Sequence, residues 1–236
     1  MSVDSATITT FNERKQMPNW VYNGLTAEGK PESVKKMMEQ LNTPFTRMHE
    51  QWNVETGQME KKQYLFPNPV FSFWNIIKPT DLDAYENQPD TTGAPSIDNF
   101  GEYMKWTSTQ NDWYNWNINN WGTKWDVAVS YEEENPNTYM EDTVNGENHV
   151  VYYNFNTAWS RPMPALIKLS EQYPDLLFTL TYEEETGWGG ELELLRGVVI
   201  SESEYDDKCR ECDETDCLEF NEEKEVMVCL KCGYES

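Results

Sequence analysis

Two Cys-x-x-Cys pairs restrict the fold of this chain more than any other feature of its sequence. Cys209 and Cys212 form the first pair, Cys229 and Cys232 form the second, and sixteen residues separate the pairs. This spacing is typical of a zinc ribbon, in which four thiolates surround one Zn²⁺ ion. Iron in the same cage and a redox-active dithiol are the competing interpretations. Four cysteine ligands leave no open coordination position, so we expect a structural Zn²⁺ ion rather than a catalytic one.

The segment around these cysteines is small. Phe220 and residues 226–228 can form a β-hairpin between the pairs, and Gly233 permits the backbone to turn beneath the sulfurs. A core of this size gains too little from burial, so the metal must supply the folding free energy. Cys217 is a fifth cysteine that could replace one ligand, but we expect it to be a spare thiol.

Negative charge is concentrated in the later part of the chain. The formal net charge is −24, from 42 Asp and Glu against 18 Lys and Arg. Residues 1–80 contain 8 acids and 9 bases, whereas residues 81–236 contain 34 acids and 9 bases. Residues 201–236 alone contain 13 acids and 4 bases. Such a surface repels nucleic acid and attracts a basic groove, although solubility is the simpler explanation.

Hydrophobic periodicity and turn residues predict an α+β domain. Strands are expected at 19–26, 70–77, 124–129, 150–155, 176–182 and 191–200, and helices at 31–41, 106–121 and 161–173. This order favours a ferredoxin-like antiparallel sheet with packed helices. We therefore divide the chain into a ferredoxin-like domain, residues 1–203, and an acidic four-cysteine zinc ribbon, residues 204–236.

Two helix ends carry specific signals. Gly122 is a natural C-cap for a tryptophan-rich helix, and Ser160 is a candidate N-cap for the next helix. The tryptophans of the first helix could stack bases or sugars, but their spacing favours core packing. We expect four of these side chains to be mostly buried: Trp113, Trp116, Trp121 and Trp125.

The sequence offers little to build a catalytic site. His49 and His149 are the only histidines, no nucleophile motif accompanies either, and no glycine-rich phosphate loop is present. The glutamate runs 132–134 and 183–185 could bind cations or a partner, although such runs are more often simply solvated. The chain lacks an apolar run near the ~20 residues that span a bilayer, and residues 1–7 lack signal-peptide features. We expect a non-enzymatic, cytoplasmic protein.

Three stretches together resemble a known family: Met17–Asn23, Asn119–Asp126 and Phe155–Pro164. They are similar to the YubB-type ferredoxin-like-fold proteins, which phages, prophages and conjugative plasmids carry. The resemblance covers approximately residues 17–200 and implies a β-α-β-β-α-β fold without an iron–sulfur cluster. It supplies no established catalytic residues. The acidic ribbon is an addition to the family's basic unit, and Arg161 stands where a second proline is expected.

These features favour a protein that binds and modulates or inhibits a host protein of the defence, transcription or translation machinery. The acidic surface would meet a basic groove on that protein, with Glu132, Glu133, Glu134, Glu183, Glu184 and Glu185 as candidate contacts. Two alternatives stay open: a nucleic-acid-binding accessory protein and a metal-dependent enzyme that uses the glutamate runs.

Overall fold

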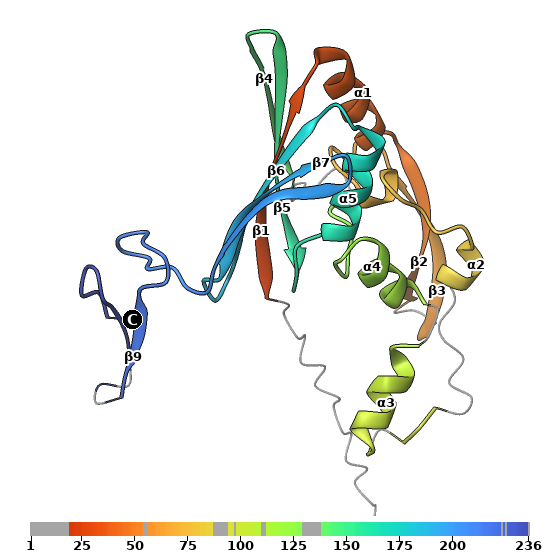
Figure 1. The fold of residues 1–236 in the computed structure, drawn as a ribbon. Helices are drawn as coiled ribbons and strands as arrows, with labels where there is room; N and C mark the ends of the chain where they lie inside the picture. Colours follow the sequence, from red (N-terminus) through yellow and green to blue (C-terminus); the bar gives the residue numbers. More distant parts are fainter. Residues whose placement is uncertain are drawn as a thin grey trace, which may run out of the picture.

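A six-stranded antiparallel sheet forms the centre of the molecule (Figure 1). The computed structural model describes residues 19–53, 56–86, 94–96, 98–109, 112–128, 138–222, 224 and 226–235. The strands lie in the order β4-β5-β1-β6-β7-β8. Their bounds are β1 Trp20–Gly29, β4 Tyr139–Asn145, β5 Asn148–Ala158, β6 Leu177–Glu184, β7 Gly189–Leu195 and β8 Val198–Tyr205.

The connections between these strands confirm the predicted ferredoxin-like α+β fold. Helix α1 (Pro31–Leu41) follows β1, and helix α5 (Met163–Gln172) joins β5 to β6. In the chain order β1-α1-β4-β5-α5-β6, the first strand lies between β5 and β6, with β4 outside β5. This is the split β-α-β arrangement. Strands β7 and β8 extend the sheet beyond β6.

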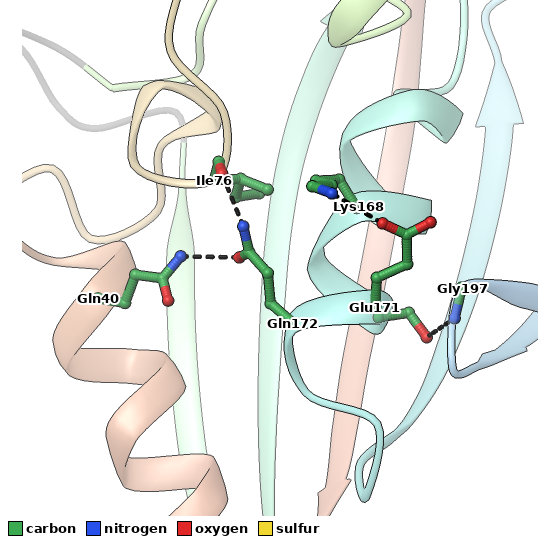
Figure 2. A network of polar contacts seen from close by, with 7 residues as sticks. Gln40, Ile76, Lys168, Glu171, Gln172 and Gly197 are labelled. Carbon is green, nitrogen blue, oxygen red and sulfur yellow. Dashed lines mark hydrogen bonds and ion pairs between the residues drawn. The ribbon is translucent and has the colours of Figure 1, made fainter.

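Both helices cover the same face of the sheet. Val34, Met37 and Leu41 are the buried residues of α1, and they pack in one core with Ala165, Leu166 and Leu169 of α5. Gln172 connects the two helices with the segment after Asn75: its side chain accepts a bond from Gln40 Nε2 and donates one to the Ile76 carbonyl, both at 2.9 Å (Figure 2). The strand side chains that alternate with the buried ones point to the opposite face.

A long insertion between α1 and β4 contains elements that the sequence predicted only in part. It consists of a hairpin, a 3₁₀ turn and three helices: β2 Phe45–Asn53, β3 Gln58–Phe66, η1 Phe73–Asn75, α2 Leu82–Glu86, α3 Phe100–Thr107 and α4 Trp113–Asn120. Asp112 begins α4 by accepting a bond from the Asn115 N–H, so the predicted single helix through residues 106–121 is two helices. Gly122, with φ of 84°, ends α4 as expected.

The predicted strands at 70–77 and 124–129 are wrong. Phe71 and Phe73 are fully buried, but they lie in a loop that ends in η1, and Asp126 organises that loop. The Asp126 carboxylate accepts bonds from Ser72 Oγ at 2.7 Å, Phe73 N at 2.8 Å and Trp74 N at 3.1 Å. These apolar runs are buried because a carboxylate satisfies the loop backbone, not because they pair in a sheet.

Two further boundaries differ from the sequence prediction. Ser160 does not cap α5, because its hydroxyl donates instead to the Gly122 carbonyl and the helix begins at Met163. The predicted strand 191–200 is two strands, β7 and β8, which turn at Arg196 and Gly197. Both residues of this turn have positive φ, 56° and 75°, which suits a tight two-residue hairpin turn.

Candidate metal centre and the uncovered face of the sheet

Two turns and a short hairpin bring four thiols together. Strand β9 (Leu218–Asn221) pairs with β10 (Val226–Cys229), and the two Cys-x-x-Cys turns lie at one end of this hairpin. The Sγ atoms of Cys209, Cys212, Cys229 and Cys232 all lie within 4.8 Å of one another. The structure therefore confirms that the four predicted residues could hold one metal ion.

The spacing of the sulfurs fits a tetrahedral ion. Cys209 Sγ lies 3.7 Å from Cys232 Sγ, and Cys212 Sγ lies 3.7 Å from Cys229 Sγ. A tetrahedron with Zn–S bonds of about 2.3 Å has edges of about 3.8 Å. The donor set and the distances therefore suit Zn²⁺, and no large movement of the thiols is needed to bind it.

Backbone donors prepare Cys229 to be a thiolate. The N–H groups of Cys232 and Lys231 point at the Cys229 sulfur, at 3.5 and 3.4 Å. The bond from Cys232 is the largest influence, and together these bonds lower the pKa of Cys229 to about 6 although burial opposes them. Gly233, with φ of 77°, donates its N–H to the Cys229 carbonyl and closes the second turn, as its position predicted.

Cys217 is buried beside the metal centre but outside the set of four. Its Sγ lies 3.5 Å from Cys229 Sγ and 3.2 Å from the Glu214 carbonyl oxygen. Burial, followed by the neighbouring Cys229 sulfur, raises the pKa of the Cys217 thiol to about 11. The four sulfurs that all lie within 4.8 Å of one another do not include that of Cys217, so the geometry supports the expectation that Cys217 is not one of the ligands.

The ribbon connects to the sheet through the turn that follows β6. Lys208 Nζ forms an ion pair with Glu183 at 3.1 Å, and Arg210 donates to the Glu185 carbonyl. The predicted boundary after residue 203 falls within β8, which continues to Tyr205. Residues 209–235 carry the metal centre beyond that strand.

The two predicted glutamate runs have different outcomes. Residues 132–134 lie outside the described residues. In the second run, Glu183 pairs with Lys208, whereas Glu184 is buried and accepts bonds from the backbone N–H and hydroxyl of Thr186. Burial would raise the pKa of Glu184, but these bonds and one from Asn19 hold it below its usual value. Glu185 is the exposed carboxylate of this run.

Among the described helices, α1 and α5 pack on one face of the sheet, and we call the opposite face the uncovered face. It carries acids that were not singled out in the sequence. Five glutamates point away from the helices, one or two from each of four strands: Glu28, Glu141, Glu183, Glu191 and Glu193. Among the six described strands of the sheet, there is no Lys or Arg. The alternation Glu-Leu-Glu-Leu over residues 191–194 was the signal that could have placed two of these acids on one face.

His149 is the histidine whose side chain the structure describes. His149 Nε2 lies 2.9 Å from Asp142 Oδ2 across the β4–β5 hairpin, far along the chain from the metal centre. The side chain of His49 lies outside the described residues. Of the helices that the structure describes, none has the length and apolar character needed to cross a membrane.

Comparisons with known proteins agree with the fold. Residues 124–230, a little under half of the chain, match the family model described as the ferredoxin-like domain in Api92-like protein. This match contains Cys209, Cys212 and Cys229, so it extends into the segment that the sequence interpretation treated as an addition, and it ends before Cys232. No curated protein matches the chain.

One solved structure is also similar, a protein api92 from Yersinia pseudotuberculosis. Its sequence identity to this chain is 11%, with a TM-score of 0.40 over 81% of this chain and 99% of that one.

Proposed function

We propose that this chain is a non-enzymatic binding protein whose acidic surface docks onto a basic groove of another protein. The uncovered face of the sheet supports this proposal, because Glu28, Glu141, Glu191 and Glu193 lie on it without a Lys or Arg from the six described strands. Charges of one sign on a broad surface steer an oppositely charged partner and raise its association rate.

The same face is unsuited to a phosphate backbone. Binding to nucleic acid depends on Lys and Arg that displace condensed counterions, and these residues are missing from the six described strands of the central sheet. Tight, salt-sensitive retention of nucleic acid in a filter-binding assay would favour the alternative of a nucleic-acid-binding accessory protein. A metal and substrate screen on the purified protein tests the enzymatic alternative.

The resemblance to the YubB-type proteins of phages and conjugative plasmids suggests the source of the partner. We propose a host protein that normally holds nucleic acid in its basic groove, in the defence, transcription or translation machinery, and a cytoplasmic location for the complex. In this proposal, Zn²⁺ is the ion held by Cys209, Cys212, Cys229 and Cys232, and its role is to fold the ribbon.

The experiment compares two charge-matched double variants in capture from bacterial host lysate, followed by kinetics with the captured protein. Glu191→Gln with Glu193→Gln removes two charges from the uncovered face. Glu32→Gln with Glu39→Gln removes two charges from α1, on the other face. We expect the first variant to lower the association rate several-fold at low salt and the second to leave it nearly unchanged. Equal effects of both variants, or an association rate indifferent to salt, would refute docking through this face.

A further inference from the structure

An exposed aromatic cluster lies where β1 begins and β5 ends. Four rings follow one another: Trp20 and Trp125 have centroids 6.1 Å apart, Trp125 and Trp159 are stacked at 6.3 Å, and Tyr114 meets Trp159 at 6.4 Å. The exposed fractions are 40% for Trp125, 39% for Trp159 and 37% for Tyr114. The expectation that Trp125 is buried is therefore wrong, whereas Trp121 is fully buried and Trp113 and Trp116 are partly buried.

The backbone holds this cluster in place. Trp159 has φ of 67°, a conformation that a bulky residue seldom adopts, and its N–H donates to the Asn19 carbonyl at 2.8 Å. Thr123 Oγ1 bonds to both the N–H and the carbonyl of Ala158, at 3.1 Å each. These bonds fasten the loop before Trp125 to the end of β5. An exposed tryptophan kept in an unfavourable conformation points to a requirement for the position of its ring.

An ammonium group already occupies the cluster. Lys124 Nζ lies 4.4 Å from the ring centroid of Trp125, 4.9 Å from that of Trp159 and 5.9 Å from that of Tyr114. These are the distances of cation–π contacts, and three rings around one ammonium are the arrangement of an aromatic cage. Within the described part of the chain, Lys124 has no carboxylate partner, and burial lowers its pKa. Among the described residues, the three rings are the groups that contact this ammonium.

The aromatic cluster borders the uncovered face of the sheet, which carries the glutamates. Trp20 is the first residue of β1 and points to the uncovered side, next to Tyr22, which is 47% exposed. The Trp20 carbonyl accepts the N–H of Glu185, the exposed carboxylate after β6. Aromatic residues and arginine dominate the binding energy of protein interfaces, usually beside a polar rim. An arginine or lysine side chain is the ligand that suits rings in an acidic neighbourhood.

We propose that Trp125, Trp159 and Tyr114 form a cage for an arginine or lysine side chain of the protein partner, in which Lys124 is a resident cation that the partner displaces. This inference rests on the proposed function, because the cage would bind a basic side chain of the same partner protein at the edge of the uncovered face. An incoming guanidinium would stack on the tryptophan faces that the Lys124 ammonium now covers, and Lys124 would extend into solvent, since its side chain is only partly buried.

The test uses a probe that needs no partner protein. N-acetyl-argininamide is titrated into the full chain while the tryptophan indole N–H signals are followed by NMR and the tryptophan emission by fluorescence. We expect saturable shifts at Trp125 and Trp159 in the millimolar range, and Lys124→Met should bind the probe about tenfold more tightly because the competing cation is gone. Trp159→Ala and Trp125→Ala should each weaken binding at least fivefold. Trp188→Phe is the control, because Trp188 packs against Tyr182 outside the cage.

Three outcomes would contradict the proposed cage. If Lys124→Met leaves probe affinity unchanged or lowers it, the lysine does not compete for the site. If adenosine monophosphate binds instead and Lys124→Met abolishes that binding, the cluster is a site for a nucleotide, whose base stacks on the rings and whose phosphate pairs with Lys124. If no probe shifts the indole signals of the wild-type or Lys124→Met protein, the rings are not a binding site. The salt dependence of partner association would still test the proposed function separately.

Discussion

Replacing one thiol of the metal centre should unfold the ribbon and leave the sheet intact. The hydrophobic cluster of the described ribbon contains only Cys209, Cys217 and Cys229 as buried members, with Cys212 and Leu218 beside them. Burial of these side chains cannot offset the ordering of the ribbon's backbone, which costs about 1–2 kcal/mol per residue. Binding of Zn²⁺ to four ligands contributes about 10–16 kcal/mol, or roughly 3 kcal/mol for each thiolate if shared equally.

This magnitude predicts that Cys232→Ser weakens zinc binding by at least about a hundredfold, since 1.4 kcal/mol corresponds to a factor of ten. Cys217→Ser should change it less than about threefold, because Cys217 is outside the set of four. Zinc content by elemental analysis and competition with a chelator measure both variants, and hydrogen exchange locates the unfolded residues. A Cys217→Ser protein without metal, or a Cys232→Ser protein with an unprotected β1 or β6, would refute the reasoning.

Three further perturbations test the folded domain. Asp126→Ala should destabilise it by about 3 kcal/mol in denaturant unfolding, because Phe73 N and Trp74 N lose their acceptor; a loss below ~1 kcal/mol would show that the loop does not depend on this carboxylate. Gly122→Ala should cost roughly 1–3 kcal/mol, since φ is 84° and the added carbon would lie 2.6 Å from Pro164 Cδ; an unchanged melting temperature would contradict it. Because the pKa of Glu184 is lowered in the folded state, its stabilising effect is complete above the ordinary carboxyl pKa of 4.5 and is lost as pH falls through the folded pKa. Glu184→Gln should therefore flatten the acid side of the stability–pH curve, and an identical curve for both proteins would show that Glu184 has no such effect.

Which acids share one surface depends on the sheet rather than on the sequence run. Glu183, Glu184 and Glu185 are consecutive, yet one is paired with Lys208, one is buried against Thr186 and one is exposed. Their different environments come from the turn after β6 and from the docking of the ribbon. Glu191 and Glu193 share the uncovered face because alternate residues of a strand point the same way, although they are not consecutive in the sequence.

The sequence by itself determined the elements whose signals are local. Pro31 and the apolar stripe Val34, Met37 and Leu41 define α1, and the β-branched and aromatic run near Val151 defines β5. The two Cys-x-x-Cys turns specify their own geometry, so the four cysteines that could hold a metal ion were named without a structure. The ferredoxin-like sheet was predicted correctly even though the expected strands at 70–77 and 124–129 are not strands and β4 was not among the expected elements.

Only the tertiary structure decided those conformations that depend on hydrogen-bond partners far along the chain. Phe71 and Phe73 lie in a loop because Asp126, more than fifty residues later, binds its backbone. Strand β4 forms by pairing with β5. The loop that carries Trp125 is bonded to the end of β5 through Thr123 and Ala158, and Trp125 is exposed there. A hydrophobic pattern predicts which residues tend to be buried. Hydrogen-bond partners far along the chain determine whether such a run forms a strand, a buried loop or an exposed aromatic cluster.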